Sequence, residues 1–287
     1  GEGDFAPEAP ATQTFTARLS MGDGRRVATG RDFGDDGVLK GDSTKGARVL
    51  HLDEAAAALI ANAVMDDASV KVTDVAEKPY TRRPYAPFTT STLQQEAAKK
   101  LSFGSKRTMR VAQDLYEGIE IGPEGAVGLI TYMRTDSTRV AESAATQARE
   151  YLHTLFGKEF LAPAIQLYGD GKVKNAQDAH ESVRPTDPTR RPDDVRKYLS
   201  VDQFKLYQLV WQRFMGSQMA PAVFDTTTVD YDIPSREQPQ IGRRSYLFRS
   251  TGSIIQFQGF MARYPATRQA GHPNGPEAGH RPPSAPP

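Results

Sequence analysis

Residues 92–116 read TLQQEAAKKLSFGSKRTMRVAQDLY and predict two helices joined by a short turn. Thr92 is expected to cap the first helix, with Gln95 completing a capping box. The apolar face of this helix repeats at helical spacing, at Leu93, Ala97 and Leu101. Gly104 is expected to end it. Ser105 is expected to cap the second helix, one face of which carries Thr108, Ala112, Leu115 and Tyr116. A helix–turn–helix pattern is weakly specific by itself.

Positive charge gathers around these two helices. Between Lys78 and Gln113, eight Lys or Arg residues stand against one acid, Glu96, whereas the whole chain has a net charge of only +1. Lys106 and Arg107 fall at the start of the second helix, where backbone N–H groups also favour phosphate. Two interpretations stay open, a nucleic-acid-binding surface and an ordinary solvated helix face.

Further elements flank this centre on both sides. Alternating patterns predict strands at residues 15–20, 48–52, 69–75, 226–231 and 246–249. Asp53 is expected to cap a helix that runs to Val64, and Lys78–Phe88, with three prolines, is expected to be an extended linker. Two more helices are expected, one from Asp136 or Ser137 to Gly157 and one opened by a Ser200/Gln203 capping box.

These elements predict an α+β fold with a β-rich domain and a helical domain. The expected boundaries are a disordered start at 1–14, β-rich segments at 15–90 and 219–263, a helical domain at 91–218, and a disordered Pro-rich tail at 264–287. The β-rich domain would therefore be assembled from two separate parts of the chain.

A tyrosine with reactive potential lies in Thr131–Thr138, which reads TYMRTDST. Residues 128–134 are expected to form a short strand, so Tyr132 and Arg134 would share a face. A phenol can attack phosphorus where a nearby cation favours its phenolate and neutralises charge on the phosphate. On spacing alone, a buried structural tyrosine is the more common explanation.

A second polar segment, residues 178–186, reads DAHESVRPT. His180 could donate a proton or contact a phosphate oxygen, and Arg184 could bind phosphate with two hydrogen bonds. Without other information, a capped turn in which Glu181 and Arg184 form a surface salt bridge is the favoured interpretation. Two other polar motifs are expected to be structural: Asp230-Tyr-Asp, in a strand, and His153, on a helix face.

Composition excludes several classes of protein. The chain has no cysteine, so disulfides, thiolate catalysis and Cys-ligated zinc are excluded. No apolar run approaches the roughly 20 residues that cross a membrane, and the acidic, Pro/Ala-rich start is not a targeting signal. We therefore expect a cytoplasmic protein without a membrane partner.

Several long motifs, in this order, resemble type IA DNA topoisomerases of the bacterial topoisomerase I group. The resemblance rests on RPYAPFTTSTLQQEA (83–97), KRTMRVAQDLYE (106–117), GLITYMRTDST (128–138), VKNAQDAHESVRPTD (173–187) and LYQLVWQRF (206–214). It covers roughly residues 15–259. It implies a β-rich arch and a winged-helix-like domain that carries the catalytic tyrosine.

The resemblance also implies residue roles. Tyr132 matches the nucleophile that holds the 5′ end of a cut DNA strand as a phosphotyrosine, Arg134 the arginine at the scissile phosphate, and His180 the histidine that assists there. The set assigned to DNA binding is Lys106, Arg107, Thr131, Asp136, Glu181 and Arg184. The implied activity is transient cleavage of one strand, strand passage and religation, which relaxes negative supercoils without ATP, in a monomer that acts at the nucleoid.

One departure from the family limits this expectation. The family's N-terminal Toprim domain, whose acidic residues hold Mg²⁺, has no counterpart in this sequence. We therefore expect a central fragment that has no metal ligands of its own and is inactive or weak by itself. Whether a separate polypeptide supplies that domain stays open. Two alternatives follow, a DNA-binding module without catalysis and an inactive remnant.

Overall fold

The computed structural model describes residues 15–40, 49–65, 70–169, 180–236 and 244–264, which form two compact units. The first unit contains residues up to Lys78 together with Asp225–Ile254; the second contains Pro79–Phe224 and the described residues from Ile255. The expected disordered start at 1–14 lies outside the described residues. Of the expected tail at 264–287, only Tyr264 is described, and its side chain is buried.

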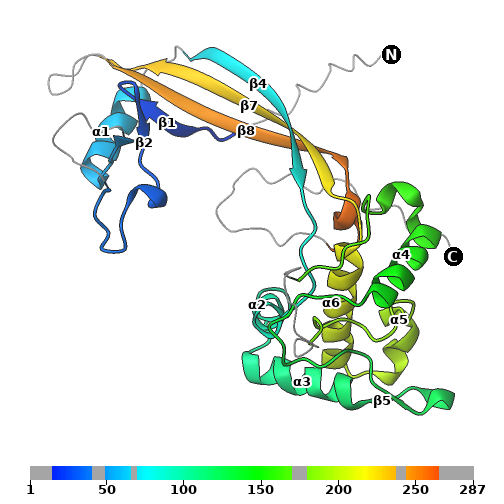
Figure 1. The fold of residues 1–287 in the computed structure, drawn as a ribbon. Helices are drawn as coiled ribbons and strands as arrows, with labels where there is room; N and C mark the ends of the chain where they lie inside the picture. The colour runs from blue at the N-terminus through cyan, green and yellow to red at the C-terminus, as the bar shows by residue number, and fades with distance from the viewer. Residues whose placement is uncertain (1–14, 41–48, 66–69, 170–179, 237–243, 265–287) are drawn as a thin grey trace, which may run out of the picture. The chain divides into compact units, whose positions relative to one another are not determined.

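The first unit is built on a six-stranded sheet of strand order β3-β2-β1-β8-β7-β4. The strands span Arg18–Gly22 (β1), Arg25–Val27 (β2), Val49–Leu50 (β3), Lys71–Arg82 (β4), Ala222–Pro234 (β7) and Ser245–Phe257 (β8). Strand β1 pairs antiparallel with β2 and β8, and β2 pairs parallel with β3. The three long strands β4, β7 and β8 run side by side (Figure 1), and helix α1 (Glu54–Met65) belongs to the same unit.

Strand β4 is longer than its sequence pattern indicates. It runs through Pro79 to Arg82, so the first half of the expected linker at 78–88 is a strand. Because β4 is the last strand in the sheet order, a residue without an N–H is tolerated there. An alternating pattern cannot show this, since proline looks like a strand breaker until the strand is known to lie at an edge.

Polar side chains pair across β7 and β8. The hydroxyls of Thr226 and Ser253 lie 3.0 Å apart, and Arg249 donates to both carboxylate oxygens of Asp230 at 2.7 and 2.8 Å. The hydrogen bonds from Arg249 hold the pKa of Asp230 below its usual value. Asp230 is therefore half of an ion pair within the sheet, in keeping with the structural interpretation of the Asp-Tyr-Asp motif.

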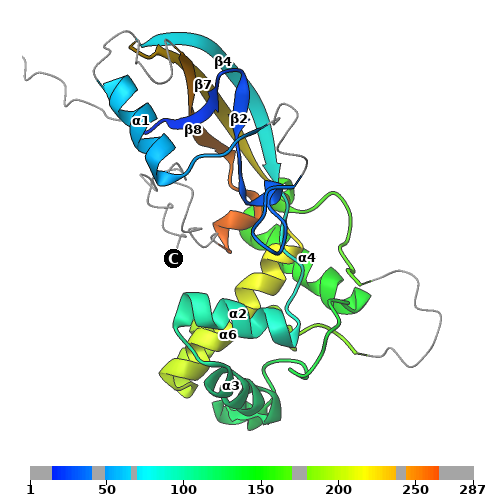
Figure 2. The same ribbon diagram turned by 90° about the vertical axis from the view of Figure 1, so that its left-hand side faces the viewer.

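The second unit is helical. Its helices are α2 (Thr90–Leu101), α3 (Ser105–Glu117), α4 (Glu142–Phe156), α5 (Pro192–Val195) and α6 (Val201–Ser217). Helices α2, α3 and α6 lie close together in both ribbon views (Figures 1 and 2), and their apolar faces share one core. Leu93, Leu115, Tyr207 and Phe214 are fully buried in it. Removal of these apolar faces from water is the main source of stability for this unit.

The helix ends differ from the expected ones in four places. Helix α2 starts earlier, because the side chain of Thr89, not Thr92, accepts the N-terminal hydrogen bond, and Thr92, not Gln95, completes the capping box. It also ends earlier, since Ser102, at φ 58°, takes the left-handed position. The N-cap of α3 is Gly104, at φ −69°, not Ser105. Helix α4 begins at Glu142, not at 136 or 137. The Asp53 cap of α1 and the Ser200/Gln203 capping box of α6 are present as expected.

A buried arginine ties the ends of the second unit to α6. Arg213 donates to the carbonyl oxygen of Ala86 at 2.5 Å and to the hydroxyl of Tyr264 at 3.2 Å, and its guanidinium lies over the rings of Tyr85 and Phe88. Burial raises the pKa of Tyr264, which keeps this phenol neutral. These contacts explain why residues 79–90 and 255–263 belong to the helical unit, although the expected boundaries assign them to the β-rich one. Tyr264, expected in the disordered tail, belongs to the helical unit as well.

Within the described residues, no helix combines the length and the apolar character needed to span a bilayer.

Replacing a core residue of α6 should unfold the second unit more easily. Phe214→Ala removes a fully buried ring and is expected to lower the free energy of unfolding by about 3–5 kcal/mol. The matched control on the same helix is Val201→Ala, at a side chain that is 68% exposed, with an expected change within about 0.5 kcal/mol. Urea titration followed by circular dichroism measures both. Equal unfolding midpoints would contradict the assigned core.

Candidate active site around Tyr132

The segment that carries Tyr132 is irregular, and neighbouring elements hold it in place. The N–H of Leu129 donates to the carbonyl oxygen of Leu115 at 2.7 Å. The N–H of Thr131 donates to the carbonyl oxygen of Arg184 at 2.9 Å. Ile130 forms a single isolated bridge, with Pro185. The expected strand at 128–134 is therefore wrong, because this segment has single partners on different elements and no continuous neighbouring strand.

Side chains nevertheless alternate along this segment. Met133 and Thr135 are buried, whereas Tyr132 (43% exposed) and Arg134 face solvent. The inference that Tyr132 and Arg134 share a face therefore agrees with the structure, although the segment is extended without being a strand. Asp136 continues the exposed set.

Thr90, at the start of α2, fixes the backbone on the far side of Tyr132. Its hydroxyl lies 2.7 Å from the carbonyl oxygen of Met133 and accepts the N–H of Thr135 at 2.8 Å. The N–H of Thr90 also donates to the carbonyl oxygen of Thr135 at 2.8 Å. Sequence reasoning missed this residue, because a threonine in a run of threonines and serines gives no sign of a partner 45 positions away.

Thr131 joins the tyrosine segment to the segment that carries His180. Its hydroxyl donates to the carbonyl oxygen of Ser182 at 2.7 Å and accepts the N–H of Arg184 at 3.0 Å. The hydroxyl of Thr131, assigned from the sequence to DNA binding, is thus engaged within the protein. These hydrogen bonds fix the register between two segments that are about fifty residues apart in sequence.

Two hollows open beside Tyr132 and share Thr135 and His180 in their walls. One, of about 330 Å³, is lined by Thr131, Tyr132, Thr135, His180, Glu181 and Arg184. The other, of about 420 Å³, is lined by Thr90, Ser91, Arg134, Thr135, Asp136 and His180. His180, from a distant part of the chain, therefore lines one hollow with Tyr132 and another with Arg134.

Glu181 and Arg184 form an ion pair within the wall of the smaller hollow. Two guanidinium nitrogens of Arg184, Nη2 and Nε, lie 2.6 and 2.7 Å from the same carboxylate oxygen of Glu181. The side chain of Arg184 is only 12% exposed. The salt bridge favoured from the sequence is therefore present, though mostly buried. Arg184 could bind a phosphate only if this pair opened or if the phosphate approached its remaining N–H groups.

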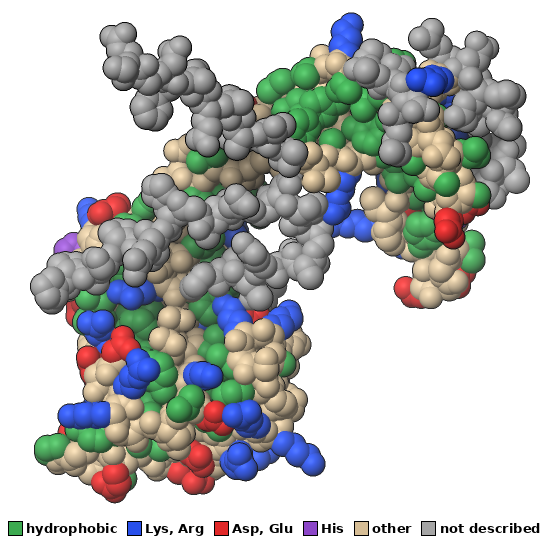
Figure 3. Space-filling view, turned by 180° about the vertical axis from the view of Figure 1, so that it is seen from behind, with side chains coloured by type: hydrophobic (Ala, Val, Ile, Leu, Met, Phe, Trp, Pro, Cys, Tyr) green, Lys and Arg blue, Asp and Glu red, His purple; other side chains and the backbone are tan. Residues whose placement is uncertain are grey.

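The basic start of α3 is only partly available to a ligand. Arg107 donates to both carboxylate oxygens of Asp202 at 2.7 Å and lies over the ring of Phe103. The hydrogen bonds from Arg107 lower the pKa of Asp202. Lys106 is exposed. On one face of the helical unit, Lys and Arg side chains are interspersed with Asp and Glu (Figure 3).

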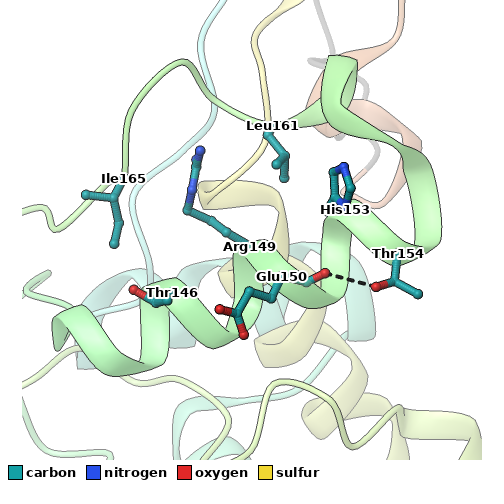
Figure 4. A pocket seen from close by; sticks show the side chains of 7 residues that line it. All are labelled: Thr146, Arg149, Glu150, His153, Thr154, Leu161 and Ile165. Carbon is teal, nitrogen blue, oxygen red and sulfur yellow. Dashed lines mark hydrogen bonds between the residues drawn. The ribbon is translucent and has the colours of Figure 1, made fainter.

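A further hollow, of about 500 Å³, lies along α4 and does not include Tyr132 (Figure 4). Arg149 spans it and donates to the carbonyl oxygens of Ala162 and Ala164 at 2.9 and 3.2 Å. His153 is an exposed side chain in its wall, not the packed histidine expected from the sequence.

No group of three or more His, Asp or Glu side chains suited to a metal ion is found among the residues that the structure describes. The side chains around Tyr132 that could meet an anion are Arg134, His180 and the partly neutralised Arg184. Chemically, the site brings a phenol, a guanidinium and an imidazole into one region, and groups of these kinds can take part in attack on a phosphate ester.

Removing the Thr90 hydroxyl should loosen the tyrosine segment. In Thr90→Val, which keeps the shape of the side chain, the N–H of Thr135 loses its acceptor and is expected to exchange with solvent about fivefold to tenfold faster. Amide hydrogen exchange measured by NMR tests this. Thr90→Ser is the control and should retain the parent's protection, and unchanged protection in the valine variant would show that the hydroxyl does not hold the segment.

Comparison with known proteins matches this chain to DNA topoisomerases. A family model described as DNA topoisomerase matches residues 29–279, which extends past residue 259, where the resemblance was expected to end. DNA topoisomerase 1 of Mycolicibacterium smegmatis is 47% identical over 251 residues, covering 87% of this chain and 25% of that protein. DNA topoisomerase 1 of Mycobacterium tuberculosis is 46% identical over 265 residues, covering 91% and 26%.

Among solved structures, the full-length topoisomerase I of Thermotoga maritima matches with a TM-score of 0.58 and 35% identity, over 76% of this chain and 32% of that one. The chain spans about a quarter of the length of the curated relatives it matches. The α+β fold and the family expected from the sequence are confirmed. Because the family model covers most of the chain, the protein belongs to the family of type IA DNA topoisomerases.

Proposed function

We propose that this chain supplies the nucleophile and part of the DNA-binding surface of a type IA DNA topoisomerase, with Tyr132 as the residue that cuts the strand. One observation carries the proposal: Tyr132 is an exposed phenol on a backbone fixed by Thr90, Leu115 and Arg184, and it lines the same hollow as His180. A held but accessible nucleophile beside a proton donor is what this reaction requires.

The reaction is a transesterification. The phenolic oxygen of Tyr132 loses its proton and attacks a backbone phosphorus, which forms a P–O bond to tyrosine and breaks the bond to the 3′ oxygen. The 3′ oxygen leaves as a hydroxyl after taking up a proton, and the 5′ end stays attached to the protein. Religation reverses these steps, so no ATP is needed, because one phosphodiester is exchanged for another.

Neighbouring residues take separate roles in this proposal. Arg134 binds the non-bridging oxygens of the scissile phosphate, where its charge offsets the negative charge that builds during attack. His180, which lines both hollows, contacts the phosphate or donates the proton. Asp136, beside Arg134 in the larger hollow, contributes to the DNA-binding wall. The Glu181–Arg184 pair shapes the wall of the smaller hollow, which Tyr132 also lines.

The complete activity belongs to a longer assembly in this proposal. Strand passage, relaxation of negative supercoils and the use of Mg²⁺ are assigned to a longer protein, because the chain spans about a quarter of the relatives it matches. A Toprim domain, from the same or another polypeptide, would supply the Mg²⁺ ligands. Without that domain we expect the chain to be inactive or weak in cleavage, although it carries Tyr132, Arg134 and His180. The substrate would be single-stranded segments of supercoiled DNA in the cytoplasm, at the nucleoid, bound by a monomer.

Covalent capture tests the nucleophile. The protein is incubated with Mg²⁺ and a single-stranded oligonucleotide labelled on the side that becomes attached, then denatured and separated on a gel. Because the chain alone is expected to be weakly active at most, the test compares variants: any slower band that the parent forms should also form with Tyr80→Phe, an exposed control tyrosine, and should be absent for Tyr132→Phe. A band that persists in Tyr132→Phe would assign the nucleophile to another residue.

Binding of single-stranded DNA tests the basic surface on α3. Lys106→Ala should weaken binding and reduce the slope of log K against log salt by about 0.7, the value for one phosphate contact. Arg107→Ala is the comparison, with a smaller effect on the slope, because its charge is already paired with Asp202. Equal slopes for Lys106→Ala and the parent would remove Lys106 from the DNA-binding surface. Binding without any covalent capture would favour the alternative of a DNA-binding module.

A further inference from the structure

A second exposed tyrosine lies against the proposed nucleophile. Tyr116 stands in the last turn of α3, and its ring meets that of Tyr132 edge-on, with centroids 5.2 Å apart and an angle of 61° between the planes. The two side chains are 42% and 43% exposed, so neither ring is fixed by burial in the core. Each ring is therefore an important restraint on the orientation of the other.

The backbone sets this ring pair in place. The N–H of Leu129 donates to the carbonyl oxygen of Leu115, which brings the tyrosine segment onto the end of α3. At Gly128 the chains come so close that an added Cβ would lie 2.6 Å from the carbonyl oxygen of Tyr116. Only glycine permits this approach without a shift of the backbone. The distance between the two tyrosine backbones is thus set by main-chain contacts, and the rings meet as a consequence.

We propose that Tyr116 is a positioning residue for Tyr132: its ring holds the phenol of Tyr132 in one orientation, toward the hollow that His180 lines. An exposed tyrosine would otherwise exchange between staggered rotamers, only some of which place the hydroxyl oxygen at the substrate. Restricting the nucleophile to the reactive orientation raises the rate without a change in its chemistry. The contribution of Tyr116 to cleavage rests on the proposed role of Tyr132 as the nucleophile. The restraint of Tyr116 on the Tyr132 ring does not depend on that role.

The ring of Tyr116, not its hydroxyl, is the active part in this proposal. Tyr116→Phe keeps the edge-on contact, whereas Tyr116→Leu removes the aromatic face. Because Tyr116 is well exposed, neither change should unfold the protein, and the thermal midpoints of both variants serve as the check.

Two readouts separate the inference from the proposed function. The first is NMR of ring-labelled tyrosine, with the Tyr132 signal assigned by its absence in Tyr132→Phe. Its ring-proton shifts should move toward the values of a free tyrosine in Tyr116→Leu and stay near the parent's in Tyr116→Phe. Shifts in Tyr116→Leu that equal the parent's would overturn the inference, whether or not the chain cleaves DNA.

The second readout is the rate of covalent capture on single-stranded DNA. Tyr116→Leu is expected to slow capture about threefold to tenfold with DNA affinity unchanged, and Tyr116→Phe to restore the parent rate. Capture at the parent rate in the leucine variant would overturn the positioning role. A parent that forms no adduct would show that cleavage needs the Toprim domain, and the NMR shifts would then decide the inference.

Discussion

Residues 128–135 have no helix or strand ladder of their own, so neighbouring elements must satisfy their backbone hydrogen-bonding groups. Three elements do so: the end of α3 through Leu115, the start of α2 through Thr90, and the segment 182–185 through Thr131 and Ile130. An unpaired buried group costs about 1–3 kcal/mol, so the segment is stable only where all three meet. Because these three elements hold the segment, the backbone of Tyr132 is fixed while its side chain stays exposed.

The rest of the helical unit follows from the need to bring those three elements together. Helices α2 and α3 pack with α6 through one core, and α6 reaches the ends of the unit through Arg213, which binds Ala86 and Tyr264. The apolar core of the helical unit stabilises it, whereas the polar contacts of Arg213 fix which chain segments lie against α6. An arginine that is buried among aromatic rings is costly unless its N–H groups are paired, so this contact favours a single arrangement of the chain.

Local patterns predicted much of this fold. Helical periodicity placed α1, α2, α3 and α6, and capping residues marked the starts of α1 and α6. Alternation placed Tyr132 and Arg134 on one face. These signals depend on neighbours in sequence. Contacts with partners distant in sequence could not be predicted from local patterns. Examples are the hydrogen bonds of the Thr90 hydroxyl, the ring contact of Tyr116 and the pairing of Arg107 with Asp202. The expected strand at 128–134 failed for the same reason, since one bridge with Pro185 replaces a continuous ladder.

Mass spectrometry of the protein–DNA adduct tests the central claim, that this arrangement makes Tyr132 the nucleophile. Trypsin releases residues 111–134 as one peptide, which contains both Tyr116 and Tyr132, so fragmentation must locate the attached nucleotide within it. The account predicts a 5′-phosphoryl nucleotide on Tyr132 and none on Tyr116. A nucleotide on Tyr116, or on any tyrosine outside this peptide, would contradict it.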